Sequence, residues 1–433
     1  MREGSFTMRI FLTGATGFIG SRILRRLSER AHQVTCLVRP RGKREIDARA
    51  LPGVSTLAGE FTQPESWLDT VSNHDVVINA VGIIRETASA GFDAVHTHAP
   101  ITLFEAAAKA GIRKVIQISA LGADAEAQSS YHLSKRAADQ RLTELGVAHV
   151  ILRPSFVYGP QDQSMTFFLS LAALPLTPVP GDGKYRVQPI HIDDLVRAVV
   201  DAVERDELQN VIVDVAGATP LTFDELLDHL ARRIGKKQAC KLHVPWGVME
   251  TVAAITDALG GHGPITRDEL GMLHRGNTCD LAHLRKVFGF EPVSFAVGIQ
   301  RKPLTQADRW YATLTHVRLP LRLSVAFIWI ATGIVSAFFS VETGFALLRQ
   351  IGITGALANL CLYGTSYLEI AIGLLTAIGW HVRWMGVIQL LLMAGFMAIL
   401  SFGMPDLWLH PFGPLTKNIP IIGATLAMMA LEE

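Results

Sequence analysis

The chain has 433 residues, which is enough for two or three domains of ordinary size. Its formal net charge of +1 gives no sign of a nucleic-acid partner, and its four cysteines form no CxxC pair, so neither a metal site nor a disulfide framework is predicted. The mean hydropathy of +0.29 is high for a soluble protein, and the apolar excess is concentrated after residue 320.

Short apolar runs alternate with helical patterns from residue 8 to about residue 217. This alternation is typical of a doubly wound α/β fold with a parallel sheet. The predicted strands are "RIFLTG", "QVTCLVR", "VSTLAG", "DVVINAVG", "KVIQIS", "HVILRPS" and "VIVDVAG". Between the first two, Ile19, Ile23, Leu24 and Leu27 recur at helical spacing and predict an amphipathic helix.

The turn "TGATGFIG" joins the first strand to this helix. Gly14 permits a tight turn, Gly17 lets the backbone approach a pyrophosphate, and Gly20 lets helix and strand pack closely. The N-terminus of the helix supplies free N–H groups for the anion. We therefore predict a dinucleotide site over residues 1–217; the alternative is a glycine turn with a structural role only.

The second predicted strand ends at Arg39, where an NAD site usually carries an acid for the ribose hydroxyls. A guanidinium cannot accept from the 2′-OH, but it matches a 2′-phosphate. Arg41, Lys43 and Arg44 follow. The pattern favours NADP(H) over NAD(H), and the alternative is a solvated basic loop.

Residues 218–318 mix helical patches with many Pro and Gly breaks. One of the patches is "FDELLDHLARRIG". We interpret this region as a small cap on the sheet, where a substrate pocket would form.

Long apolar stretches follow at 323–340, 362–379, 384–403 and 418–431, and Glu369 is the one charged residue within them. A membrane-spanning helix needs roughly 20 apolar residues. The first three stretches qualify and the fourth is short, so we predict a four-helix transmembrane domain over residues 319–433. A buried helical core in a soluble domain is the alternative.

No charged-then-apolar leader precedes the first strand, so the nucleotide-binding domain is expected in the cytoplasm. Arg318, Arg322 and Arg383 would then flank the inner ends of the spans, with Arg349 and Lys417 outside. Four spans would return the C-terminus to the cytoplasmic face of an inner membrane.

Several motifs together resemble the extended and atypical short-chain dehydrogenase/reductases, which have a Rossmann fold. They are "TGATGFIG", "NAVGIIRE", "ISALGADA", "YHLSK", "LRPSFVYGP" and "QPIHIDDL". Within that superfamily the chain is most similar to the group of the NADPH-binding accessory subunit of respiratory complex I. The last 110 residues resemble the DoxX-like membrane family.

The resemblance implies roles for the pair Tyr131 and Lys135. The tyrosine would donate a proton to substrate, and the lysine would lower the tyrosine pKa and hold the nicotinamide ribose. Because the two lie at i and i+4, one helical face presents both. Ser119, the third candidate catalytic residue, falls in the first place of the family's serine pair, and Ala120 falls in the second place, which normally carries the catalytic serine that orients the substrate carbonyl. Ser129 and Ser130 are possible substitutes.

The same resemblance implies a wider set of cofactor-binding residues. They are Thr13, Gly14, Thr16, Gly17, Phe18, Ile19, Gly20, Arg39, Asn79, Gly82, Lys135, Arg153 and Pro154. His191 and Asp193 are expected to have structural roles, as ring and helix-cap contacts. Glu369 is a candidate functional residue in the membrane, with His410 or Lys417 as its partner.

Two functions follow from these observations. In the first, the protein is a membrane-tethered NADP(H)-binding oxidoreductase that passes hydride to a lipophilic carbonyl or quinone from the bilayer. In the second, it is a non-catalytic, NADPH-binding assembly or sensor protein of a membrane complex. Ala120 favours the second function, and the Tyr131 and Lys135 pair favours the first.

Overall fold

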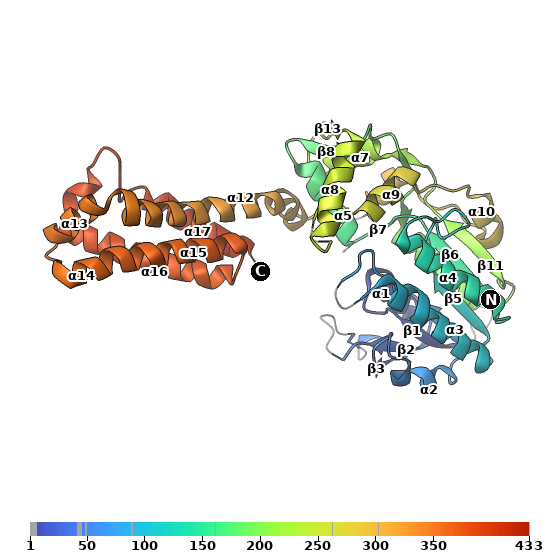
Figure 1. Ribbon diagram of the computed structural model, residues 1–433. Helices are drawn as coiled ribbons and strands as arrows, with labels where there is room; N and C mark the ends of the chain where they lie inside the picture. The colour runs from blue at the N-terminus through green and yellow to red at the C-terminus, as the bar shows by residue number, and fades with distance from the viewer. Residues whose placement is uncertain are drawn as a thin grey trace. The chain divides into compact units, whose positions relative to one another are not determined.

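The computed structural model describes residues 7–40, 46–47, 50–87, 90–160, 162–261, 263–301 and 303–432. Arg41, Lys43 and Arg44 of the predicted basic loop lie outside these residues. The chain divides into two units, Met1–Thr305 and Gln306–Glu433 (Figure 1). Each unit has its own core.

A seven-stranded sheet forms the centre of the first unit, in the order β11-β6-β5-β4-β1-β2-β3, with every pair parallel. The strands are β1 Arg9–Thr13, β2 Gln33–Val38, β3 Val54–Ala58, β4 Val76–Asn79, β5 Lys114–Ile118, β6 His149–Pro154 and β11 Val211–Val215. All seven coincide with predicted strands, so the doubly wound α/β fold is confirmed. The strand order reverses between β1 and β4, which is where such sheets bind ligands.

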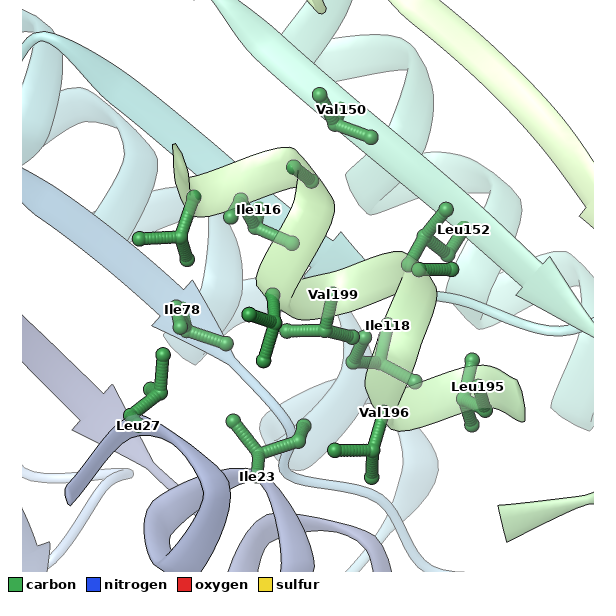
Figure 2. Packing of buried hydrophobic residues seen from close by; sticks show 14 of the residues in the cluster. Ile23, Leu27, Ile78, Ile116, Ile118, Val150, Leu152, Leu195, Val196 and Val199 are labelled. Atoms are coloured by element: carbon green, nitrogen blue, oxygen red, sulfur yellow. The ribbon is translucent and has the colours of Figure 1, made fainter. Parts of the chain in front are cut away.

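Helices cover both faces of the sheet. On one face lie α1 Phe18–Glu29, α6 Ile192–Glu204 and α10 Ala282–Phe288, and on the other α2 Leu68–Val71, α3 Ala99–Lys109 and α4 Ser130–Glu144. Figure 2 shows Ile23 and Leu27 of α1 and Leu195, Val196 and Val199 of α6 gathered over the strand residues of the first face. These packed apolar layers hold the strands in place. The carboxyl ends of the strands, where the site lies, are therefore fixed as well.

The cap is built from two separate segments of chain. The first holds α5 Gln163–Ala173 and β8 Thr177–Pro180, and the second holds α7 Phe223–Arg233, β13 Lys241–Val244, α8 Trp246–Ala258 and α9 Arg267–Arg275. They are joined because β8 pairs with β13 and α5 packs on α7. The chain then returns to the sheet through α10, so only part of the predicted range 218–318 lies in the cap.

Short elements complete the first unit. They are η2 Pro64–Ser66, η3 Asp93–His98, β7 Val157–Tyr158, β9 Arg186–Val187, β10 Ile190–His191, β12 Leu221–Thr222 and α11 Phe295–Gly298. His191 precedes α6, and its Nδ1 accepts a hydrogen bond from the Asp193 backbone N–H at 3.2 Å. This ring therefore caps a helix.

The second unit is helical. Its elements are α12 Gln306–Ile334, η4 Val335–Phe339, α13 Val341–Gln350, α14 Gly355–Asn359, η5 Leu360–Gly364, α15 Thr365–Ile378, α16 Val382–Gly403, η6 Pro405–Trp408 and α17 Asn418–Leu431. Three helices of the described chain are long and apolar enough to cross a membrane: 306–339, 355–378 and 382–403. The fourth, α17, is apolar but shorter, as predicted. Because α12 is continuous from Gln306, the predicted boundary at residue 318 falls inside it.

Glycines bring α12 and α15 close together. An ideal Cβ on Gly333 would lie 2.6 Å from the Ser366 carbonyl oxygen, and one on Gly373 would lie 2.9 Å from the Ile330 backbone nitrogen. Small residues at such contacts let helix backbones approach, which is how helices associate in lipid. The contact therefore fits a membrane domain.

Three arginines meet Glu432 at one end of this helical unit, two of them through its carboxylate. Arg318 and Arg322 of α12 form ion pairs with Glu432, the latter at 3.2 Å. Arg383 at the start of α16 donates from Nε to the Glu432 backbone carbonyl at 2.8 Å. We call these four residues the arginine clamp. The clamp brings together residues 318–322 of α12, which directly precede its apolar stretch, the beginning of α16 and the end of α17.

Two polar side chains inside the bundle have partners on a neighbouring helix. Gln389 of α16 donates to the Thr376 hydroxyl of α15 at 2.8 Å, and both side chains are buried. Glu369 has a hydrogen bond with Thr332 of α12. His410 accepts from the Phe412 N–H, and the described contacts pair Glu369 with neither His410 nor Lys417.

Candidate cofactor and active site

The turn after β1 is shaped by its glycines. Gly14 has φ +77°, and an ideal Cβ there would lie 2.6 Å from the backbone of Ala80. Gly17 donates its N–H to the Gly14 carbonyl at 2.9 Å and precedes α1 without a side-chain cap. Thr16, Phe18 and Ile19 are half-buried around it. The turn therefore leaves the N-terminus of α1 open to an anion, which fits a dinucleotide pyrophosphate.

Buried polar side chains cross the carboxyl ends of three neighbouring strands. The Thr13 hydroxyl of β1 donates to Asn79 Oδ1 of β4 at 2.7 Å, and Asn79 Nδ2 donates to Gln117 Oε1 of β5 at 2.8 Å. Asn79 Oδ1 also accepts from the Val81 N–H at 3.3 Å. These bonds fix the turn after β4, which carries Gly82 past the edge of the sheet.

Tyr131 lies in the first turn of α4 and is held by rings. Its ring makes edge contacts with Phe92, His96 and His132, at centroid distances of 5.8, 5.4 and 5.3 Å. Burial raises the pKa of Tyr131 to about 12. Burial therefore outweighs the lowering of this pKa that is expected from Lys135. At neutral pH the phenol is protonated, which is the form that can donate a proton.

Lys135 lies one helical turn further along α4 and is 3% exposed. Its Nζ donates to the carbonyls of Val81 at 3.1 Å and Ile118 at 3.2 Å. An ideal Cβ on Gly82 would lie 3.4 Å from this Nζ, so the ammonium sits directly beneath that glycine. Burial lowers the pKa of Lys135 to about 8, and nearby Asp139 opposes the shift. The ammonium is thus placed at the strand edge where a ribose would lie.

Ser119 has a different partner from the one its predicted role requires. Its hydroxyl donates to Asp139 Oδ2 at 2.7 Å, and Arg153 Nε donates to the same oxygen at 3.1 Å. Burial raises the pKa of Asp139 to about 6, with these two donors acting against the shift. Because Asp139 lies on α4 four residues after Lys135, Ser119 and Arg153 anchor the helix that carries the predicted pair. Ala120 is buried beside them.

The two serines that precede Tyr131 are also engaged. Ser129 caps α4, accepting from the His132 N–H at 3.2 Å, and Ser130 donates its own N–H to Asp268 of α9 at 3.1 Å. Arg275 of α9 donates to the Gly122 carbonyl at 2.9 Å. The cap therefore borders the site and fixes the loop that leads into α4.

His96 is a site residue that the sequence did not reveal. It is fully buried, its Nε2 accepts from the Ile83 N–H at 3.0 Å, and its Nδ1 lies 3.2 Å from the Ser134 hydroxyl. Burial and the charge of Lys135 lower its pKa to about 2, so the ring is neutral. His96 ties the Gly82 loop to α4.

The remaining predicted cofactor residues lie around the same edge. Arg39 follows β2 and is exposed, and Pro154 ends β6, where its carbonyl accepts from the Leu121 N–H at 2.8 Å. Gly20 packs α1 against the Gly14 carbonyl. The structure therefore brings the turn, Asn79, Gly82, Tyr131 and Lys135 to one edge, whereas the Ser119 hydroxyl points to Asp139.

Two family models match separate parts of the chain. Residues 10–216 match the NAD dependent epimerase/dehydratase family, and residues 326–426 match the DoxX-like family. Together they cover the sheet domain and most of the helical unit.

Named relatives and a solved structure resemble the first unit. Ceramide reductase of Caulobacter vibrioides is 28% identical over 250 residues, which are 58% of this chain and 77% of that protein. Mitochondrial NADH dehydrogenase (ubiquinone) 1 alpha subcomplex subunit 9 of Dictyostelium discoideum is 25% identical over 236 residues, 54% of this chain and 65% of that one. The Bordetella bronchiseptica enzyme WbmG, solved with NAD, matches with TM-score 0.55 at 17% identity over 72% of this chain and 98% of that one. This last likeness supports the fold.

Proposed function

Since the chain joins an NAD(P)-binding domain of the NAD dependent epimerase/dehydratase family to a DoxX-like membrane domain, we propose that it is a membrane-tethered, NADP(H)-dependent reductase of a lipophilic carbonyl or quinone. The observation that carries this proposal is the pair on α4. A protonated Tyr131 lies one helical turn from a buried Lys135, beneath the Gly82 loop. The relation to a ceramide reductase supports a lipophilic substrate.

The residues of the site have distinct tasks in a carbonyl reduction. A bound nicotinamide supplies a hydride to the carbonyl carbon. Tyr131 gives its phenolic proton to the carbonyl oxygen, so that C=O becomes CH–OH, and solvent then returns a proton to the phenolate. Lys135 holds the ribose, and its charge stabilises the phenolate formed as the proton leaves. The open N-terminus of α1 binds the pyrophosphate.

NADPH oxidation by the full chain in proteoliposomes tests this function directly. The assay uses a panel of long-chain ketones, aldehydes and quinones, with short water-soluble analogues as controls. We expect turnover with at least one long-chain compound and lower kcat/KM for its short analogue. Tight NADPH binding without oxidation across the panel would contradict the reductase.

A second function has a specific observation in its favour. Ala120 stands in the usual place of the catalytic serine, and the Ser119 hydroxyl is bonded to Asp139. The relation to a complex I subunit supports a role in a membrane assembly. In this alternative the protein binds NADPH as a structural or sensing ligand, and loss of NADPH would disturb the assembly without any loss of turnover.

Arg39 is the residue proposed to select NADP(H). It follows β2 at the carboxyl edge of the sheet and is exposed, as a contact to a 2′-phosphate requires. Replacement by Asp is expected to weaken NADPH binding by about ten- to a hundredfold, because charge-assisted hydrogen bonds are worth about 1.5–3 kcal/mol. Fluorescence titration with NADPH and NADH measures the change. Equal affinities for the two cofactors before and after Arg39→Asp would rule out the assignment.

For the membrane domain we propose four crossings in an inner membrane, with both ends of the chain cytoplasmic. The arginine clamp supports this topology, since it joins Arg318 and Arg322, which directly precede the apolar stretch of α12, to the end of α17. Reporters fused before Met1 and after Glu433 are expected to be active in the cytoplasm only. Periplasmic activity of the second fusion would mean that α17, about 21 Å long at 1.5 Å per residue, does not complete a crossing.

A further inference from the structure

Four helices of the second unit enclose a common interior. Helix α12 packs on α15, α15 on α16, α16 on α17 and α17 on α12, so the four form a closed ring. Figure 1 shows them running alongside one another. Glycine contacts fix their levels: an ideal Cβ on Gly379, after α15, would lie 2.9 Å from Arg322 Nη1, and one on Gly386 of α16 would overlap Met429 of α17. The level of a residue can therefore be counted from the arginine clamp.

Three buried polar atoms in this interior have no hydrogen-bond partner among the described residues, besides Arg322 Nε in the clamp. They are Nε1 of Trp329 in α12, Oε1 of Gln389 in α16 and the hydroxyl of Thr425 in α17. The three side chains are at most 5% exposed. A polar group that is kept from water and left unpaired costs folding free energy, so these atoms indicate a bound partner.

The three residues lie at one level of the bundle. Trp329 and Thr425 are seven residues from the nearest clamp residue along the chain, and Gln389 is six. At 1.5 Å per residue, each lies about 9–11 Å from the clamp along its own helix. Trp329 also packs in one apolar cluster with Leu390 and Met428, which are close to Gln389 and Thr425 on their own helices. We call these three residues, Trp329, Gln389 and Thr425, the buried polar layer.

Other buried polar groups of the bundle are paired within the protein. The hydroxyls of Ser366 and Thr376 each donate to a carbonyl one turn earlier on their own helix, at 2.7 and 2.8 Å. Because the Thr376 proton is already given to Ile372, the Gln389 amide must face it with its NH2 group, and Nε2 donates at 2.8 Å. The Gln389 oxygen is thereby left as an acceptor. The layer presents one fixed donor, one fixed acceptor and the Thr425 hydroxyl.

We propose that the buried polar layer binds ordered water. Water both donates and accepts, so it can take a hydrogen bond from Trp329, give one to Gln389 and share one with Thr425. About three bonds to otherwise unpaired groups are typical of a buried water molecule. An ion is disfavoured, because Trp329 offers only a donor and Gln389 only an acceptor. A lipid chain is disfavoured, because Met393 and Met428 of the same cluster are at most 6% exposed and closely packed.

Water at this level would lie one helical turn from Glu369. The partner of Glu369 is Thr332, which is three residues after Trp329 on α12. Polar groups and water, and not only aliphatic side chains, would then lie between Glu369 and the arginine clamp. This inference concerns the membrane domain and does not depend on the proposed reaction.

Water-edited solid-state NMR on the full chain in phospholipid vesicles tests the site. Tryptophan is labelled with ¹⁵N at the indole, and magnetisation passes from water protons to each indole N–H during a short mixing time. Trp384, which is 68% exposed, is the positive control. Trp67 is the matched control, because it is fully buried and its Nε1 donates to the Phe61 carbonyl at 3.1 Å. The spectrum of Trp329→Phe identifies the Trp329 signal.

We expect the Trp329 signal to build up from water as fast as that of Trp384 and several times faster than that of Trp67. In Gln389→Leu the water loses its acceptor, and the build-up at Trp329 should fall to the level of Trp67. Met393→Leu, a volume-conserving change one turn further along α16, is the control variant and should leave the build-up unchanged.

Build-up at Trp329 as slow as that at Trp67 in the wild type would overturn the proposal, and this comparison stands even if Gln389→Leu does not fold. Rapid transfer from lipid acyl-chain protons without transfer from water would also overturn it, since a lipid group would then occupy the layer. Equal build-up from water in the wild type and Gln389→Leu would show that the helices share no water site.

Discussion

The Tyr131→Phe protein is expected to bind NADPH as the wild type does but to lose turnover by about 10²- to 10⁴-fold, the usual worth of a positioned general acid. The ring keeps its contacts with Phe92, His96 and His132, because none of them uses the hydroxyl. Only the proton donor is removed. Steady-state NADPH oxidation and a binding titration on the same preparation measure the two effects.

A change at Lys135 separates binding from proton transfer. Lys135→Met keeps most of the stem but removes the ammonium and its bonds to the Val81 and Ile118 carbonyls. We expect NADPH affinity to fall about ten- to a hundredfold, the worth of a charge-assisted hydrogen bond of about 1.5–3 kcal/mol. Unchanged affinity would mean that the ammonium does not contact the cofactor.

Complementation of a deletion strain distinguishes the two proposed functions. If the protein is a reductase, Tyr131→Phe should fail to rescue while its NADPH binding stays intact. Full rescue by Tyr131→Phe, together with failure of a variant that cannot bind NADPH, would count for the assembly or sensor role.

The second large effect is expected at the glycine turn. In Gly20→Ala the new methyl group would overlap the Gly14 carbonyl oxygen and lie 2.7 Å from its carbon. Both neighbours are backbone, so the turn itself must move away from α1. Overpacking of this kind costs about 1–3 kcal/mol, and the displaced N–H groups would no longer meet the pyrophosphate. We expect lower thermal stability and loss of measurable NADPH binding.

Gly271→Ala is the matched control for this substitution. Gly271 is also inside a helix, α9, but an added Cβ meets nothing within 4 Å. Alanine there should stabilise the protein by roughly 0.5–1 kcal/mol, because glycine loses more backbone entropy on folding. If Gly20→Ala and Gly271→Ala have the same effect on cofactor binding, the contact between Gly20 and Gly14 has no role in it.

The centre of the sheet was predictable because its strands carry continuous apolar runs that are buried on both faces. The runs at Val76–Asn79 and Lys114–Ile118 are examples, and helices cover them on either side. The turn was predictable for a related reason. Gly14 needs a left-handed φ and Gly20 a close contact, and only glycine meets both needs.

The details of the site depend on tertiary contacts that no local pattern encodes. No local sequence pattern marks Asp139 as a site residue. Its role becomes visible only because the fold brings it to Ser119 and Arg153. His96 becomes significant only because the Ile83 N–H points at it. The cap was harder still to predict from the sequence, because strands β8 and β13 pair across about sixty residues of sequence. Sequence spacing alone says nothing about such pairings.

The arginine clamp has a consequence for the order in which the membrane domain is made. Arg318 and Arg322 precede the apolar stretch of α12 that begins at residue 323, whereas Glu432 follows α17, so their shared carboxylate emerges from the ribosome after every helix of the bundle. During insertion these guanidiniums do not yet have the Glu432 carboxylate beside them, and cationic flanks resist translocation. Once α17 is in place, Glu432 neutralises part of that charge. The same residues would thus direct insertion early in biogenesis and close the bundle at its end.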